Sequence, residues 1–231
     1  MGASPTSNPD GQGAGVGFGQ AAGGGEGASA LGGMTLAGLL RAIAAKSPAP
    51  GGGAVAGAVG ALGAALAEMV VAYSLGRRDL AAHQSGLSEA QRRLARARGM
   101  FLALADDDAE AYGRVNELMR LPEGDPRRGG LAAAVEAAVT APMSVLALAA
   151  ELAALCLGLQ DKTNPRLVSD LEIAGVLAHA CARSAWCNVR VNAPMLADQG
   201  RRAAVLREAA GLVRLTGERC AWAEAGAGAA L

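Results

Sequence analysis

The segment Pro48–Met69 decides the fold, and it reads Pro-Ala-Pro-Gly-Gly-Gly-Ala-Val-Ala-Gly-Ala-Val-Gly-Ala-Leu-Gly-Ala-Ala-Leu-Ala-Glu-Met. Its two prolines disfavour helix up to about Pro50, because each restricts the residue before it to extended backbone. Beyond the glycine triplet the segment is rich in alanine and leucine, which favour helix. We therefore predict a helix from about Gly53 to Leu75 that carries almost no large side chains.

Glycine recurs at every third position inside this helix, at Gly57, Gly60 and Gly63. Each glycine lowers helix propensity by about 1 kcal/mol relative to alanine, so a close contact has to compensate. The contact is either a tightly packed neighbouring helix or a ligand. The free N–H groups and positive dipole end near Gly51–Gly53 suit a carboxylate or phosphate. The segment nevertheless lacks the lysine and the preceding strand of the known nucleotide-binding loops.

The whole sequence predicts an all-α bundle of about five long antiparallel helices plus a short N-terminal helix. Aromatic residues make up only 3% of the 231 residues, and this scarcity argues against sheets. Thr35 is expected to cap the short helix, and Pro142 to kink or interrupt a later one. The expected helices cover residues 36–45, 53–75, 85 or 88 to 119, 127–160, 169–191 and 196–225.

Two domains are expected, a Gly/Ala-rich tail at residues 1–33 and a helical domain at residues 34–231. The tail has too few large apolar residues to offset its ordering entropy, so it is predicted to be disordered. It also lacks the basic and apolar regions of a signal peptide. Because no uncharged apolar stretch reaches about 18 residues, the sequence predicts no membrane span.

Charge and cysteine content exclude several classes of function. The net charge is +0, which gives no electrostatic footprint for nucleic acid or an anionic membrane surface. The four cysteines show no Cys-x-x-Cys spacing, so they are predicted to be reduced in a cytoplasmic protein. The two histidines have no partner at a useful helical spacing, and no metal site is predicted.

One polar residue interrupts the inward stripe of the third long helix. Asp108 lies seven residues from both Phe101 and Val115, whereas Asp106 and Asp107 point away from this stripe and can be solvated. A buried carboxylate either pairs with a neighbouring helix or has a raised pKa and serves as a general acid/base. The position by itself leaves both interpretations open.

The other candidate polar groups each have a simple structural explanation as well. Asn188 and Asn192 share one helix face and could bond between helices, and Asp170 could be a helix N-cap. Arg77 and Arg78 are ordinary C-terminal cations that could also reach an anionic ligand. Tyr112 lies one turn after Asp108, and Asn164 and Ser169 lie near the start of the fifth long helix.

The set of motifs, taken in order, resembles the cyclodeaminase/cyclohydrolase family of folate enzymes. The resemblance covers about Leu36 to Leu215. It rests on Pro48–Val70, Leu75-Gly-Arg-Arg78, Asp108-Ala-Glu-Ala-Tyr112, Arg120-Leu-Pro122, Ala141-Pro142, Asn164, Ser169-Asp-Leu171 and Asn188-Val-Arg-Val-Asn192.

The resemblance implies an all-helical homodimer that acts on a tetrahydrofolate derivative without a cofactor. Asp108 falls on the family's catalytic aspartate, which agrees with its place in the apolar stripe. As hypotheses, Gly51–Gly53 with Asn188 and Asn192 bind the pterin, and Arg77 or Arg78 meets the glutamate carboxylates. Tyr112, Asn164, Ser169 and Asp170 complete the expected substrate-binding set.

Three functions remain open at this point. The first is hydrolysis of 5,10-methenyltetrahydrofolate to 10-formyltetrahydrofolate, and the second is cyclodeamination of formimidoyltetrahydrofolate with release of ammonia. Arg77-Arg78 is more similar to the bifunctional cyclodeaminase than to the stand-alone cyclohydrolases. The third is a helical interaction protein without activity. That third reading predicts a cationic partner for Asp108 and no cavity beside it.

Overall fold

A computed structural model describes residues 31–228 of the chain. The six α-helices are α1 (Leu36–Ala44), α2 (Gly52–Ala72), α3 (Gln84–Met119), α4 (Leu131–Leu159), α5 (Val168–Asn192) and α6 (Gln199–Gly228). Short 3₁₀ turns at Arg78–His83, Pro126–Gly130, Pro165–Leu167 and Ala193–Met195 lie between them. The predicted all-α bundle of five long helices and one short helix is confirmed. Residues 1–30 of the predicted tail lie outside the described residues.

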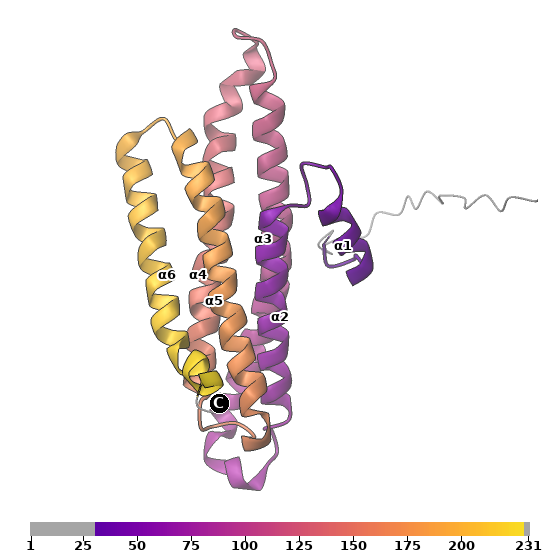
Figure 1. Cartoon of the computed structure of the whole chain (residues 1–231), viewed down its shortest axis with the longest axis vertical. Coiled ribbons are helices and arrows are strands. Elements are labelled where there is room, and N and C mark those ends of the chain that lie inside the picture. Colours follow the sequence, from indigo (N-terminus) through magenta and orange to yellow (C-terminus); the bar gives the residue numbers. More distant parts are fainter. Residues whose placement is uncertain (1–30, 229–231) are drawn as a thin grey trace, which may run out of the picture.

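The five long helices run side by side, and α1 stands away from them (Figure 1). Helix α2 packs against both α3 and α5, and α4 packs against α3, α5 and α6. The N-terminus of α2 begins part of the way along α3, so the upper parts of α3 and α5 extend beyond it (Figure 1).

The glycines of α2 allow α3 to approach very closely. A β-carbon on Gly57 would lie 2.7 Å from the Phe101 carbonyl oxygen, and one on Gly60 would lie 2.6 Å from the Phe101 ring. Both distances are shorter than van der Waals contact, so neither position accepts a side chain without a shift of α3. Close helix packing therefore accounts for these two glycines, and their cost in helix propensity is offset by contact with α3.

Two local predictions from the sequence need correction. Of the two alternatives expected at Pro142, a kink or an interruption, the interruption is wrong, because α4 continues through Pro142 as one helix. The cap of α5 is Leu167, and Asp170 lies in the first turn of that helix, so it is not the N-cap. The expected cap of α1 is confirmed, because the Thr35 side chain accepts a hydrogen bond from the Gly38 N–H.

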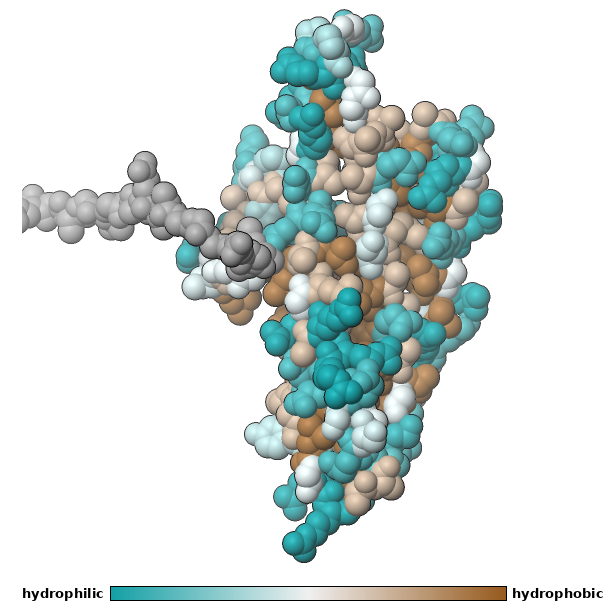
Figure 2. Space-filling view, turned by 180° about the vertical axis from the view of Figure 1, so that it is seen from behind, coloured by the Kyte–Doolittle hydropathy of each residue, from teal (hydrophilic) through white to brown (hydrophobic). Residues whose placement is uncertain are grey.

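Apolar side chains remain exposed on two outward surfaces. On α1, Leu36 is 69% exposed and no residue of the helix is buried. On α2, Val55, Leu62 and Tyr73 are exposed along one side, which we call the outer α2 face. The face seen from behind the view of Figure 1 carries hydrophilic residues at its upper end and a mixture of hydrophilic and apolar residues across its middle (Figure 2).

Two segments, Gly52–Ala72 and Pro126–Leu159, are long and apolar enough to span a membrane by composition. About half of each is buried inside the bundle, at 56% and 50% of the most apolar window. Core helices of soluble proteins pass the same test, so this is weak evidence for a membrane.

Candidate active site

A pocket of about 230 Å³ lies at the N-terminus of α2, where α3 and α5 extend past it. Three elements build it: the turn before α2, the middle of α3 and the C-terminal end of α5. Its walls are Pro48, Ala49, Gly51, Gly52, Gly53, Ala54, Asp108, Ala109, Tyr112, Asn188, Val191 and Asn192. Seven of the predicted site residues, Gly51–Gly53, Asp108, Tyr112, Asn188 and Asn192, therefore line one cavity.

The glycine turn fits directly against the polar side chains of the pocket. A β-carbon on Gly53 would overlap the Asp108 carboxylate, and one on Gly52 would lie 3.0 Å from Asn188 Oδ1. Gly51 is the N-cap residue of α2, Gly52 is its first residue, and the buried Gly53 is its second. The glycine triplet thus has a second role besides flexibility. It lets the start of α2 contact a carboxylate and an amide.

Asp108 is half-buried, and burial raises the pKa of its carboxyl above the ordinary value for aspartate. Within the described part of the chain, the Asp108 carboxylate has no hydrogen-bond or cationic partner. The positive end of the α2 dipole lies beside it and favours the anion, but desolvation is the larger effect. A carboxyl with a raised pKa at a cavity wall can accept and return a proton near neutral pH.

The two asparagines of the pocket have different surroundings. Asn192 is buried, and its Nδ2 donates to the Ala138 carbonyl oxygen of α4 at 2.7 Å. Asn188 Nδ2 is also buried, but it has no acceptor among the described residues. An unsatisfied buried donor costs about 1–3 kcal/mol. Asn192 therefore joins two helices, whereas Asn188 presents a donor that a ligand could satisfy.

Asp106 does not point freely into solvent as predicted. Its Oδ1 accepts a hydrogen bond from the Leu31 N–H at 3.1 Å, and its Oδ2 is buried without a partner. The Leu31 side chain is buried and packs with Ala54 and Ala105. Sequence periodicity missed this contact because residues just before α1 return to cover α3, which no local pattern reports.

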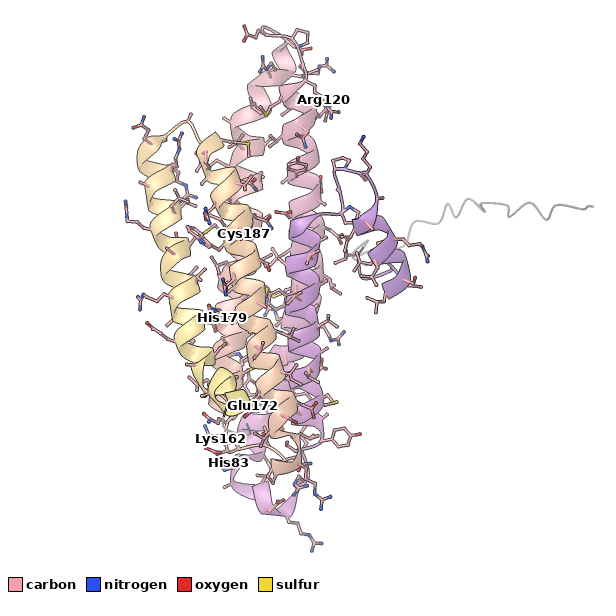
Figure 3. All side chains as sticks on the ribbon, in the orientation of Figure 1. His83, Arg120, Lys162, Glu172, His179 and Cys187 are labelled. Atoms are coloured by element: carbon pink, nitrogen blue, oxygen red, sulfur yellow. The ribbon has the colours of Figure 1, made fainter. Side chains whose placement is uncertain are left out.

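Five predicted residues lie at the other end of α2, and the fold does not bring them to Asp108 within one chain. Since α2 has 21 residues, its two ends are about 30 Å apart. Arg77, Arg78, Asn164, Ser169 and Asp170 lie near its C-terminal end. Glu172, two residues after Asp170, is at the lower end of the molecule, and Arg120 is near the upper end (Figure 3).

A network of hydrogen bonds closes this second end. Ser74 Oγ donates to the Val70 carbonyl oxygen at 2.7 Å and accepts from the Asn164 N–H at 2.8 Å. Asn164 Oδ1 caps the following turn by accepting from the Arg166 N–H. Arg77 pairs with Asp79 at 2.6 Å. Ser74 is not among the residues predicted from the sequence, and only the fold shows that it joins α2 to the α4–α5 connection.

Other cavities and clusters have less to support a site. A cavity of about 430 Å³ lies between the start of α3 and the end of α4, and none of the predicted site residues lines it. Among the described residues, no three His, Cys, Asp or Glu side chains gather closely enough to hold a metal ion. Cys156, Cys181 and Cys220 are buried, whereas Cys187 is exposed.

The fold and the pocket define an all-α protein whose half-buried carboxylate lies against the glycine turn of its central helix. The chain belongs to the formiminotransferase-cyclodeaminase family, whose profile matches residues 35–211. The resemblance stated from the sequence is thereby confirmed.

Individual relatives include both stand-alone and bifunctional proteins. Methenyltetrahydrofolate cyclohydrolase from Methylorubrum extorquens is 31% identical over 188 residues, which cover 79% of this chain and 90% of the relative. Formimidoyltransferase-cyclodeaminase from Mus musculus is 33% identical over 173 residues, which cover 71% of this chain and only 31% of the mouse protein. The crystal structure of formiminotetrahydrofolate cyclodeaminase from Thermotoga maritima matches with a TM-score of 0.75 and 27% identity. The match covers 84% of this chain and 96% of the other.

Proposed function

We propose that this protein is a folate enzyme that hydrolyses 5,10-methenyltetrahydrofolate to 10-formyltetrahydrofolate, with Asp108 as its acid/base. One observation carries the proposal. The Asp108 carboxylate has a raised pKa, has no partner in the described residues, and opens onto a cavity. A purely structural aspartate would be paired and would have no adjoining cavity. The similarity to a cyclohydrolase over most of both chains supports the choice of substrate.

The reaction needs proton transfer at two moments. Water first adds to the methenyl carbon, and a C–O bond forms while Asp108 accepts the water proton and releases it to solvent. The tetrahedral species then collapses to the formyl group. Asp108 takes the hydroxyl proton, and N5 receives a proton as the C–N5 bond breaks. These steps balance without an added oxidant, reductant or metal, and so we propose that the enzyme uses no cofactor.

The pocket supports this chemistry through position as well as pKa. A base is most effective when its pKa lies near the working pH, so the raised pKa of Asp108 favours a group that both accepts and returns protons. The unpartnered Nδ2 of Asn188 is a donor for the carbonyl oxygen or a ring nitrogen of the pterin. Tyr112 lines the pocket and is 41% exposed, so its ring is available for contact with a substrate.

The test is loss of the methenyl absorbance above the spontaneous rate with purified protein. Asp108→Asn should lower the catalysed rate by about 100-fold or more, the usual contribution of a general acid/base. Asp107→Asn is the matched control, because Asp107 is the exposed neighbour on the same helix turn, and it should keep the wild-type rate. Equal activity of the Asp108→Asn and wild-type proteins would refute the assignment.

Cyclodeamination is the second candidate, and the match to the Thermotoga maritima structure favours it. The same carboxylate would assist attack of N10 on the formimidoyl carbon and departure of ammonia. The assay therefore includes formimidoyltetrahydrofolate as a second substrate. Ammonia release without methenyl hydrolysis would assign the cyclodeaminase reaction. Turnover of neither substrate by folded protein would support the inactive interaction protein.

We also propose that the protein is a homodimer that buries the outer α2 face. This face has no charged residue at its exposed positions, since Val55, Leu62 and Tyr73 are all apolar or aromatic. A second copy would cover it with an equally apolar surface. Leu62→Glu should give a monomer in light scattering, whereas Leu157→Glu, on the exposed side of α4, should not. A monomeric wild-type protein would disprove this proposal.

A further inference from the structure

A second hollow adjoins the Asp108 pocket and lies nearer to the C-terminal end of α3. It has a volume of about 330 Å³, and Pro48, Ala49 and Tyr112 line both cavities. Its remaining walls are Gly113, Asn116, Glu117 and Arg120. The two cavities are therefore neighbours, with Pro48 and Ala49 common to both on one side and Tyr112 on the other.

Helix α3 runs along both cavities. Asp108, Tyr112, Asn116 and Arg120, the C-cap residue, follow one another at steps of four residues, so each is a neighbour of the next, and the row turns around the helix by about 40° at each step. The interval from Asp108 to Arg120 corresponds to about 18 Å along the helix axis. Gly113 lies beside this row, and a β-carbon there would meet nothing within 4 Å. Because Gly113 has no side chain, the space beside it in the second hollow stays open.

Two charged residues, Glu117 and Arg120, line the second hollow, and they differ in whether they have an ion-pair partner. Glu117 accepts a hydrogen bond from Arg114 Nη1 at 2.7 Å, so its charge is already paired. The Arg120 side chain is exposed and has no ion-pair partner among the described residues. It is the only cationic residue among the described walls of the two cavities. Arg77 and Arg78, which the sequence suggested for this role, lie at the other end of α2.

A folate has the matching shape and charge. Its reactive carbon lies between N5 and N10, and the glutamate carboxylates lie beyond the benzoyl ring and its amide, about 10 Å or more away by ordinary bond lengths. With the reactive carbon at Asp108, the benzoyl ring passes Tyr112 and the carboxylates arrive within reach of the long Arg120 side chain. A guanidinium binds a carboxylate through two parallel hydrogen bonds.

We infer that the second hollow is the glutamate subsite of the proposed folate site and that Arg120 binds the glutamate carboxylate. The inference depends on the proposed function for the identity of the substrate. Arg120 is a binding residue that determines preference for the glutamate-bearing substrate, and it takes no part in the chemistry at Asp108.

The experiment compares binding of two ligands to the full-length protein by calorimetry. One ligand is 10-formyltetrahydrofolate, and the other is 10-formyltetrahydropteroate, which lacks the glutamate. Arg120→Ala should weaken binding of the folate about tenfold or more, as expected for loss of a charge-assisted hydrogen bond. It should leave pteroate binding unchanged. The kcat for methenyl hydrolysis should remain close to wild type while KM rises.

Three further variants sharpen the test. Arg96→Ala removes another exposed arginine of α3 and should change neither ligand's affinity. Gly113→Leu fills the open space of the hollow and should weaken folate binding while thermal stability stays at or above wild type. Arg78→Ala tests the competing location at the far end of α2 and should have no effect.

The outcomes separate the inference from the proposed function. If Arg120→Ala binds both ligands as the wild type does, or if Arg78→Ala alone removes the folate preference, the glutamate subsite is elsewhere. Equal wild-type affinity for folate and pteroate also overturns the inference, although Asp108→Asn can still abolish turnover. If the wild type binds neither ligand and turns over no folate, both the inference and the proposed function fail.

Discussion

The two ends of α2 carry polar residues of the same set of motifs, yet their surroundings are opposite. At the N-terminal end, Asp108 and the Asn188 amide face a cavity, and neither Asp108 nor Asn188 Nδ2 has a partner in the described chain. At the C-terminal end, Ser74 joins Val70 and Asn164 through two short hydrogen bonds. Unsatisfied polar groups beside a cavity indicate binding or catalysis, whereas satisfied groups in a closed joint indicate stability.

Among the substitutions considered at the two ends of α2, Gly53→Ala should have the largest effect, and the effect should be on kcat. The new β-carbon overlaps the Asp108 carboxylate, so the carboxylate has to move away from its position at the pocket wall. A displacement of about 1 Å in a catalytic group can cost about 100-fold in rate, and we expect a loss of that order in kcat. Steady-state hydrolysis of the methenyl substrate measures it.

Gly99→Ala is the control for this prediction, because a β-carbon at Gly99 on α3 meets open space. It should retain full activity and should gain a little stability from the better helix propensity of alanine. A Gly53→Ala protein with the wild-type kcat would show that the close fit between α2 and Asp108 has no catalytic importance.

Ser74→Ala should affect stability at the opposite end and leave kcat unchanged. It removes both hydrogen bonds of the buried hydroxyl and leaves the Asn164 N–H unpaired. The expected loss is about 1–3 kcal/mol in the free energy of unfolding, measured by chemical denaturation. If Ser74→Ala instead lowered kcat with unchanged stability, the C-terminal end of α2 would also belong to the active site.

Inside the pocket, Asn192 and Asn188 differ in the same way, because Asn192 is hydrogen-bonded and the Asn188 amide nitrogen is not. Asn192→Ala breaks the bond to the Ala138 carbonyl oxygen and should lower the free energy of unfolding by about 1–3 kcal/mol. Asn188→Ala removes an unsatisfied buried donor, so stability should stay the same or rise. Its KM should increase up to about tenfold through loss of one hydrogen bond to substrate. Equal destabilisation by both substitutions would contradict the difference seen in the structure.

Asp108 should also make the stability of the protein depend on pH. Its pKa is raised in the folded state by burial, so between the unfolded and folded pKa values the folded state holds the extra proton. Stability therefore falls as pH rises through this window, and the loss is complete above the folded pKa. Asp108→Asn abolishes this loss, and its Tm should exceed that of the wild type at pH 7.5.

The Tm difference between Asp108→Asn and wild type should shrink on acidification and approach zero near pH 4, close to the ordinary aspartate pKa. Asp107 is exposed, so the Tm difference between Asp107→Asn and wild type should not change with pH. A constant difference across the whole pH range would mean that the folded state does not perturb the titration of Asp108.

Much of the site could be predicted from the sequence because its residues obey local rules. Asp108 was identifiable as the polar member of an apolar stripe, and the glycine turn as a helix start without side chains. Asn188 and Asn192 share a face because they are four residues apart. Asp106 could not be assigned in the same way, since its partner Leu31 lies 75 residues away in the sequence.

The sequence by itself determined the all-α class, the extent of the long helices within a few residues, and the identity of Asp108 as the exceptional carboxylate. These depend on propensity and periodicity, which act over a few neighbouring residues. The tertiary structure decided which candidates meet. It placed Gly51–Gly53 against Asp108, and it put Arg77 and Arg78 about 30 Å away while Arg120 lies near the pocket. Such proximity depends on how far α2 extends along α3 and α5, and that register comes from the close packing at Gly57 and Gly60.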